Sequence, residues 1–192
     1  SDYADPTYLY KVKGADDSTY TDQKPTQAGD YTVKATWAAT ENCPEISDTD
    51  DFSILKREIT VSAEKTVKYN GFDQKLDITE ADITAGSVAG GETLDLSASV
   101  TGKDKGVYDE LDATPAYKVT DGEGNETTSN YTITVTGKLT IEQAAADAFT
   151  GTVTLDDWTY GDEAKAEAPE VTPAGSDYAD PTYLYKVKGA DD

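Results

Sequence analysis

Several segments of the chain alternate apolar and polar residues with a period of two, which is typical of a β-strand that buries one face. In the segment 30–37 (DYTVKATW), Tyr31, Val33, Ala35 and Trp37 share one face. The same pattern occurs in Thr7–Lys13, Asp51–Leu55, Glu58–Ala63, Leu94–Val100, Pro115–Thr120, Tyr131–Ile141 and Thr152–Trp158. We therefore predict an all-β protein with about 12 strands.

Turn-forming residues separate these segments, as at Asn70-Gly71 and at 121–125 (DGEGN). The signal for helices is weak. Thr79 and Asp82 have the spacing of a capping box around a short turn. The segment 142–149 (EQAAADAF) favours helix locally but is shorter than a stable isolated helix, so we interpret it as a linker or a single turn.

One segment of 17 residues, SDYADPTYLYKVKGADD, occurs twice without a mismatch, at 1–17 and at 176–192. The offset between the two copies is 175 residues. Repetition over a long period is typical of proteins whose role is length, display or multivalency. We therefore expect the chain to represent one period of a tandem array and to begin and end inside the same unit.

The pattern also predicts the domain boundaries. Residues 55–58 (LKRE) join two strand-like stretches without a loop, and we predict a complete unit B at 57–143 followed by a linker at 144–151. Unit A is then divided. Residues 1–56 form its body without its first strand, and 152–192 form the start of the next unit A, with 176–192 duplicating 1–17.

A body that lacks its first strand would expose a sheet edge and an apolar face. Our hypothesis is that neighbouring copies complete one another head-to-tail by strand addition, which would give an open fibre. The alternative is a continuous polymer in which both copies of the duplicated segment describe a single place. The residues expected at this interface are Val153, Leu155, Trp158, Tyr160, Tyr8, Tyr10, Tyr31, Val33 and Trp37.

The charge of the chain limits its partners. The net charge is −22, from 38 acidic and 16 basic residues, and histidine is absent. With no basic face to displace phosphate counterions, we expect no nucleic-acid partner. No apolar run approaches the 18 residues that a membrane helix needs, so we expect no membrane insertion. The same charge favours solubility and repulsion between copies.

Catalytic chemistry has few candidates in this composition. The absence of histidine and the single Cys43 remove Ser-His and Cys-His nucleophile pairs and histidine-based zinc sites. Asp156, Asp157 and Asp162 could form a carboxylate pair for glycoside hydrolysis. Because acidic residues are spread along the whole chain, a solvated surface is the preferred interpretation, and we predict that the protein is not an enzyme.

Calcium is the cofactor that the sequence raises most directly. Asp121, Glu123 and Asn125 offer three oxygen side chains at alternate positions, as hard cations prefer. The spacing lacks the acid that closes an EF-hand loop, and a glycine-rich hairpin turn accounts for the same residues. We therefore expect no bound cofactor and keep calcium at these three residues as the alternative.

The predicted unit A resembles the MBG-type domains of the YGX kind that occur as repeats in Gram-positive surface proteins. The residues that carry the resemblance are those at 153–155 (VTL), 158–162 (WTYGD), 183–186 (YLYK), 25–33 (PTQAGDYTV) and 51–54 (DFSI). The predicted unit B resembles the partner repeats of such proteins, through the residues at 59–61 (ITV), 67–71 (VKYNG), 129–133 (SNYTI) and 137–141 (GKLTI).

The resemblance implies elongated tandem Ig-like or β-grasp-like domains, two in each repeat, in an extracellular protein of the bacterial cell surface. It implies a stalk or filament that projects an adhesive tip, and it supplies no catalytic residues. The alternative is a multivalent adhesin module that binds a host glycan, mucin or protein, with exposed tyrosine and tryptophan rings as the contact groups and repetition as the source of avidity.

Overall fold

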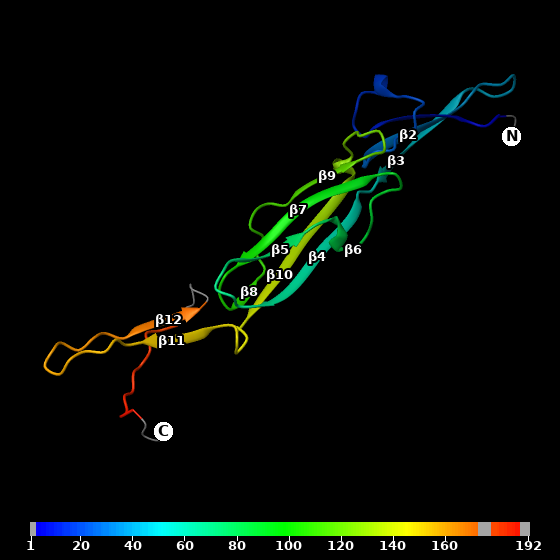
Figure 1. Cartoon of the computed structure of the whole chain (residues 1–192). Coiled ribbons are helices and arrows are strands. Elements are labelled where there is room, and N and C mark those ends of the chain that lie inside the picture. Colours follow the sequence, from blue (N-terminus) through cyan, green and yellow to red (C-terminus); the bar gives the residue numbers. More distant parts are fainter. Residues whose placement is uncertain (1–2, 173–177, 189–192) are drawn as a thin grey trace. The chain divides into compact units, whose positions relative to one another are not determined.

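The computed structural model describes residues 3–172 and 178–188. The outer residues of the duplicated segment, at 1–2, 176–177 and 189–192, lie outside the described residues. The described part of the chain contains 12 strands and three single-turn 3₁₀ helices (Figure 1). Strands make up 48% of the structure and helices 5%, which confirms the all-β prediction.

Three antiparallel strands near the N-terminus form a sheet in the order β1-β2-β3. Their bounds are Thr7–Val12 for β1, Gly29–Trp37 for β2 and Ile46–Ile54 for β3. The predicted strand at 51–55 therefore begins earlier, because residues back to Ile46 pair along the whole of β2, where Ile46 lies opposite Trp37. The helix η1 (Asp17–Thr19) lies in the connection between β1 and β2.

The middle of the chain forms two more sheets, in the orders β6-β4-β10-β8 and β5-β7-β9. The first comprises β4 (Arg57–Lys68), β6 (Ile83–Ala85), β8 (Gly106–Tyr108) and β10 (Tyr131–Glu142). The second comprises β5 (Gln74–Ile78), β7 (Thr93–Gly102) and β9 (Ala116–Thr120). The pattern did not predict β5, β6 and β8, since these strands have three to five residues and offer too few alternating positions.

Two further helices and one turn connect these strands. The helix η2 (Glu80–Asp82) begins with the predicted capping box, in which Thr79 and Asp82 bond each other's backbone amides. The helix η3 (Thr128–Asn130) immediately precedes β10. In the segment interpreted as a linker or a single turn, Ala148 N donates to Ala145 O at 3.0 Å.

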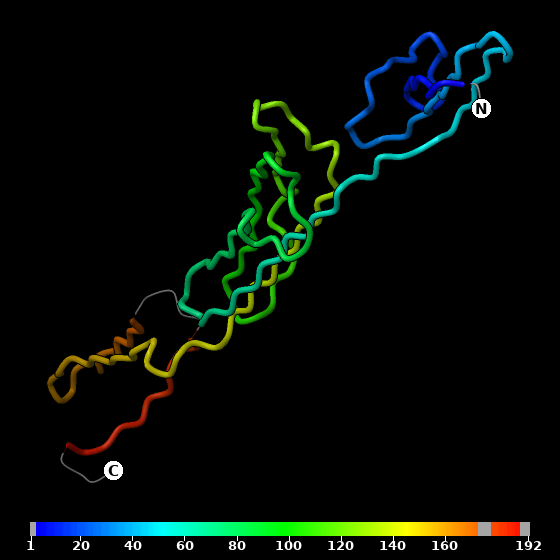
Figure 2. The backbone as a smooth tube through the Cα atoms, turned by 90° about the vertical axis from the view of Figure 1, so that its right-hand side faces the viewer, coloured from blue at the N-terminus to red at the C-terminus, as the bar shows by residue number. Residues whose placement is uncertain are grey.

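A two-stranded ribbon follows, made of β11 (Thr150–Thr154) and β12 (Ala168–Thr172) (Figures 1 and 2). The predicted strand at 152–158 is thus shifted: it starts two residues earlier and ends at Thr154. Pairing stops where Thr154 lies opposite Ala168, and the adjacent Asp156 and Asp157 disfavour a strand. Residues 178–188 then run as an extended chain that belongs to no sheet in the described structure (Figure 2).

Contacts divide the chain into two compact bodies. The first body comprises 1–62, 78–97 and 115–135, and the second comprises 63–77, 98–114 and 136–192. Both draw on residues 57–143, so the predicted boundaries of units A and B stay a prediction. The buried apolar residues of the first body are Ile59, Val61, Ile78, Leu94, Leu96, Val119 and Tyr131. Those of the second body are Ala63, Leu76, Val100, Leu139 and Ile141.

The core is therefore confined to the middle of the sequence. Every fully buried residue in the described structure lies between Ile59 and Ile141. Neither the sheet β1-β2-β3 nor the ribbon β11-β12 buries a residue to that extent. Across the described residues, no helix has the length and apolar character needed to traverse a bilayer.

Candidate assembly interface

The sheet β1-β2-β3 has one strongly apolar face. Because neighbouring residues of a strand point to opposite faces, the register places Tyr8, Tyr10 and Val12 of β1 on the same face as Tyr31, Val33, Ala35 and Trp37 of β2. From β3, Ile46, Phe52 and Ile54 join them, and Asp48 and Asp50 lie on the same face opposite Ala35 and Val33. The ring of Phe52 stacks on Tyr31 at 5.6 Å and meets the ring of Tyr10 edge-on at 6.3 Å.

All five residues that the sequence analysis placed at an interface in this region, Tyr8, Tyr10, Tyr31, Val33 and Trp37, lie on this face. The face is only partly covered. Of the five, Tyr8 is 52% exposed and the other four are half-buried, and Val12 on the same face is 60% exposed. A contiguous, partly exposed group of large apolar side chains is typical of a surface that contacts another segment or molecule.

The opposite face of this sheet is polar, and its groups satisfy one another. Asp51 accepts a hydrogen bond from Thr32 Oγ1 at 2.7 Å and pairs with Lys13 Nζ at 3.0 Å. These two interactions, the bond from Thr32 first, hold the pKa of Asp51 below its ordinary value. Ser53 Oγ donates to Asp30 Oδ1 at 2.6 Å. This face therefore has no need of an apolar cover.

The outer edge of β1 is occupied at one point. Tyr10 N donates to Thr21 O at 2.7 Å, and Thr21 N donates to Tyr10 O at 2.8 Å. Lys11 binds the loop between β1 and β2 through Asp17 at 2.6 Å and lies 4.9 Å from the ring centre of Tyr20. The N–H of Tyr10 thus points away from β2, so by the alternation of an antiparallel ladder the N–H of Leu9 points toward β2.

The ribbon β11-β12 is amphipathic as well. Its register places Gly151 and Val153 on the same face as Val171 and Pro169, while three threonines of β11 point to the other face. Val153 is 58% exposed, and Leu155, which follows the strand, is 38% exposed. An open groove on this side of the ribbon is lined by residues of both strands and of the segment 178–183.

The other two predicted interface residues, Trp158 and Tyr160, lie beyond the paired part of the ribbon. Asp162 N donates to Thr159 O at 2.9 Å, so the YGD motif forms a tight turn in which Gly161 adopts a φ of +93°. Tyr160 is fully exposed at this turn and Trp158 is 48% exposed. Asp156, Asp157 and Asp162 are exposed in the same loop.

A joint that the sequence analysis did not predict connects the first sheet to the start of β10, within the first body. Asn130 Oδ1 accepts a hydrogen bond from Ala28 N at 2.8 Å, and Asn130 Nδ2 donates to Gln27 Oε1 at 2.7 Å. The amide therefore uses both its acceptor and its donor on one loop. Both partners belong to segments quoted for the resemblance, but sequence alone gave no sign that they meet.

Next to the joint, Tyr131 anchors a loop of the core. Its hydroxyl donates to Glu92 and accepts a hydrogen bond from Ala89 N at 2.8 Å. Burial, followed by the bond to Glu92, raises the pKa of Tyr131 above its ordinary value. The motif Asn130-Tyr131 therefore combines a residue that bonds outward to the first sheet with one that bonds inward.

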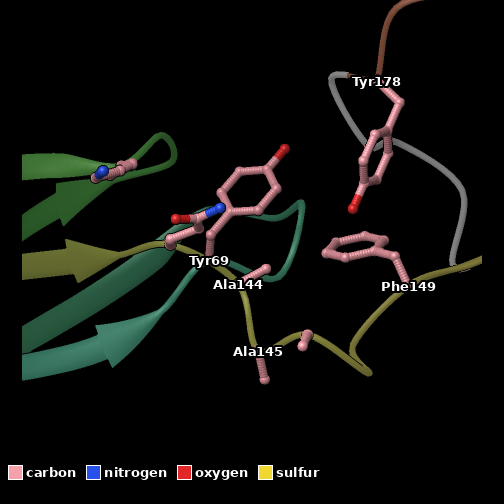
Figure 3. A pocket seen from close by; sticks show the side chains of 8 residues that line it. Tyr69, Ala144, Ala145, Phe149 and Tyr178 are labelled. Carbon is pink, nitrogen blue, oxygen red and sulfur yellow. The ribbon is translucent and has the colours of Figure 1, made fainter.

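A chain of aromatic rings lies in the second body. The rings of Tyr69 and Phe149 are 6.0 Å apart, and Tyr178 meets Phe149 edge-on at 5.8 Å (Figure 3). These rings line a cavity of about 320 Å³ together with Lys105, Gln143 and the three alanines 144–146. The turn that follows β10 thus places Phe149 against two tyrosines from distant parts of the sequence.

The residues considered for calcium form a hairpin turn. Asp121 Oδ1 accepts hydrogen bonds from Glu123 N at 2.9 Å and Asn125 N at 2.8 Å, and Asp121 Oδ2 accepts one from Asn125 Nδ2 at 3.0 Å. The bonds from Asn125 are the largest cause that lowers the pKa of Asp121. Among the described residues, no group of three or more His, Cys, Asp or Glu side chains is placed to hold a metal ion.

No family model, no curated protein and no solved structure matches the chain. The resemblance to surface-protein repeats therefore rests on the quoted motifs alone.

Proposed function

We propose that this protein is a structural repeat of an extracellular stalk or filament on a bacterial surface, built from Ig-like or β-grasp-like units, two in each repeat. In the assembled form, a ribbon with the sequence of β11-β12 covers the apolar face of a sheet with the sequence of β1-β2-β3. The role is mechanical and needs neither a catalytic site nor a cofactor. The partner of each repeat is a neighbouring copy, and neither nucleic acid nor a membrane takes part.

The proposal is based on two features that occur together: a sheet with a partly exposed apolar face, and a duplicated segment that includes the first strand of that sheet. The residues that begin the first sheet recur directly after the ribbon, at an offset of 175 residues. In the periodic sequence, the ribbon is therefore the element that precedes β1. The sheet offers an apolar face with ten large or aliphatic side chains, and the ribbon offers a matching apolar side with Val153, Leu155, Pro169 and Val171.

The joint at Asn130 supports a mechanical role. A stalk must resist bending where its sheets meet, and two hydrogen bonds from one side chain restrict rotation more than a single bond does. The connection from β3 to β4 adds a covalent constraint, because only Leu55 and Lys56 separate the two strands. The joint thus fixes the first sheet to the core of the same body.

Electrostatics sets the conditions for assembly. The ribbon residues 150–172 carry six acidic and one basic side chain, and residues 1–56 carry eleven acidic and five basic side chains. Both surfaces are therefore negative, and the apolar contact must overcome their repulsion. Salt screens this repulsion, with a screening length of about 8 Å at physiological ionic strength, so we expect assembly to strengthen as salt is added.

The test is sedimentation velocity of the 192-residue polypeptide over a range of concentrations and salt. We expect oligomers that lengthen with concentration. Val153→Asp places a charge on the apolar side of the ribbon and should weaken assembly by at least about tenfold. Thr152→Asp adds the same charge on the opposite side and is the matched control. Equal weakening by both variants, or a monomeric wild type at every concentration, would contradict the proposal.

A second function is favoured by one specific observation, the cavity between Tyr69, Phe149 and Tyr178. Aromatic faces bordered by an amine and an amide are suited to stacking on a sugar ring. The alternative is thus a multivalent module that binds host glycans. A glycan array probed with the wild type and with Tyr69→Ala would test it. Saturable binding that the variant loses would favour this function over the stalk.

A further inference from the structure

The segments 3–13 and 178–188 have the same sequence but different surroundings. In the first, Thr7–Val12 forms β1 and pairs with β2 over six residues. In the second, the equivalent residues 182–187 belong to no sheet of the described structure. Leu9 is half-buried, whereas its equivalent Leu184 is 99% exposed. A sequence that can form a strand thus lies outside the described sheets at the second place.

We propose that residues 178–188 of one polypeptide replace β1 in a second copy, where they pair with β2 and displace residues 3–13. This inference rests on the proposed function and specifies how the ribbon of one copy is held on the sheet of the next. The partner is a second copy of this chain, and the mode of recognition is strand exchange.

The exchange preserves every residue pair between β2 and the strand beside it. Because the two segments are identical, Tyr183 would lie opposite Ala35, Tyr185 opposite Val33 and Val187 opposite Tyr31, in the register that β1 has now. Each of the six residue pairs is therefore replaced by the same pair. The exchange gives up the hydrogen bond that the Tyr185 hydroxyl donates to Glu167, and it gains the apolar contact between ribbon and sheet.

The ribbon and the exchanged strand act on the same partner. Residues 173–181 connect Thr172 of β12 to Thr182, and nine residues can span at most about 30 Å. A ribbon that is already in contact therefore presents its strand at a high local concentration, and an exchanged strand holds the ribbon in place. The contact of the ribbon with the sheet and the pairing of the exchanged strand therefore strengthen each other.

The contacts of Tyr3 and of its equivalent Tyr178 support strand exchange. Tyr3 donates its hydroxyl to Pro44 O at 2.6 Å, whereas its equivalent Tyr178 packs its ring edge-on against Phe149. The first contact uses the hydroxyl and the second uses the ring. A Tyr178 that replaces Tyr3 would add the bond to Pro44 in the second copy to its contact with Phe149, and would thereby connect the two copies through one side chain.

A pair of identical substitutions tests the exchange. Leu9 directs its N–H toward β2, so proline at this position removes a bond of the ladder. Leu184→Pro removes the same bond from the donor segment, and because Leu184 is exposed and outside any sheet, this variant should fold as the wild type does. Leu9→Pro weakens the strand that must be displaced.

We expect Leu184→Pro to assemble at least about tenfold more weakly in sedimentation velocity, and Leu9→Pro to assemble about tenfold more strongly than the wild type, because it destabilises only the strand that is displaced. If Leu184→Pro assembles as the wild type does, exchange is overturned while contact through the ribbon stands. If both variants fail to assemble, exchange is overturned, because the acceptor's own β1 is then required. A wild type that never assembles overturns both exchange and the proposed function.

A milder pair removes only a hydroxyl. Under exchange, Tyr178→Phe loses the bond to Pro44 and should weaken assembly severalfold, whereas Tyr3→Phe loses that bond only in the monomer and should strengthen assembly by a similar factor. The reverse result would show that Tyr3 keeps its place in the assembled form and would overturn the exchange.

Discussion

The two copies of the duplicated segment form a comparison in which sequence is constant and only the surroundings differ. Tyr3–Lys13 contains a strand that pairs with β2, and Tyr178–Lys188 contains none in the described structure. The alternation of apolar and polar residues is the same in both. The pattern therefore states which face a strand would bury, and the presence of a pairing partner decides whether the strand forms.

Pairing alone does not create a core. The strand β1 has a partner, yet Tyr8 and Val12 remain more than half exposed because no second layer covers their face. In β10, by contrast, Leu139 and Ile141 are almost fully buried. The three segments represent successive stages: a segment outside the described sheets, a strand within a sheet, and a strand within a sheet that is also covered. Only the last stage removes the apolar side chains from water, which is the main source of stability.

The largest effect is expected from supplying a pairing partner to the second copy. If the sequence of residues 18–56 is added after Asp192, residues 178–188 gain their own β2 in the same chain. We expect the amide protons of Leu184 and Lys186, whose equivalents Leu9 and Lys11 face β2, to become protected from exchange by at least about a thousandfold, because strand amides open only with the free energy of unfolding. Hydrogen exchange followed by mass spectrometry measures this.

The control is an extension in which residues 18–56 carry Val33→Asp, which places a charge on the apolar face of the added sheet. This variant should give little protection. Equal exchange in the extended and original chains would show that the copies differ for a reason other than the supply of a pairing partner.

Substitution of one residue in the covered core and one in the first sheet should reveal the effect of cover. Leu139→Ala removes a fully buried side chain and should lower the free energy of unfolding by about 2–5 kcal/mol. Val33→Ala acts on a half-buried residue of β2 and should cost about 1 kcal/mol in the monomer. Denaturant unfolding monitored by circular dichroism measures both. Similar losses would mean that the first sheet is covered as well as the core is.

How much of this could be predicted depends on the surroundings of each residue. The strands at 29–37, 93–102 and 131–142 have long alternating runs, and their sequence pattern located them. The interface residues of the first sheet also followed from alternation. The short strands β5, β6, β8 and β12 did not, because three to five residues carry little periodic signal, and β5, β6 and β8 also pair with strands that are not their neighbours in the chain. The same limit applies to Asn130, whose bonds to Gln27 and Ala28 join residues about 100 positions apart.

The two hydrogen bonds of Asn130 should contribute less to the free energy of unfolding than the buried core residues do. Asn130→Ala removes both bonds to the loop and should destabilise the first sheet by about 1 kcal/mol, a typical net value for hydrogen bonds of this kind. Relaxation of backbone ¹⁵N should then show 7–54 moving more independently of the core. Ser129→Ala, one residue away, is the control. Unchanged relaxation in Asn130→Ala would show that the connection from β3 to β4 alone keeps the sheet in place.

The smallest effect is expected from pH, and it again separates the two copies. The pKa of Asp51 is lowered in the folded sheet by Thr32 and Lys13, so the carboxylate contributes stability above its unfolded pKa of about 3.9. That contribution falls as pH drops through the lower, folded pKa.

In a Trp158→Phe background, the fluorescence of Trp37 reports on the sheet. The difference in the free energy of unfolding between the wild type and Asp51→Asn should therefore become smaller as pH falls from about 5 to about 2. Lys13→Ala should reproduce part of the loss at neutral pH, because the bond from Thr32 remains. Lys188→Ala, the same change in the copy that forms no strand, should leave the sheet unaffected. A pH-independent difference for Asp51→Asn would mean that its charge does not stabilise the sheet.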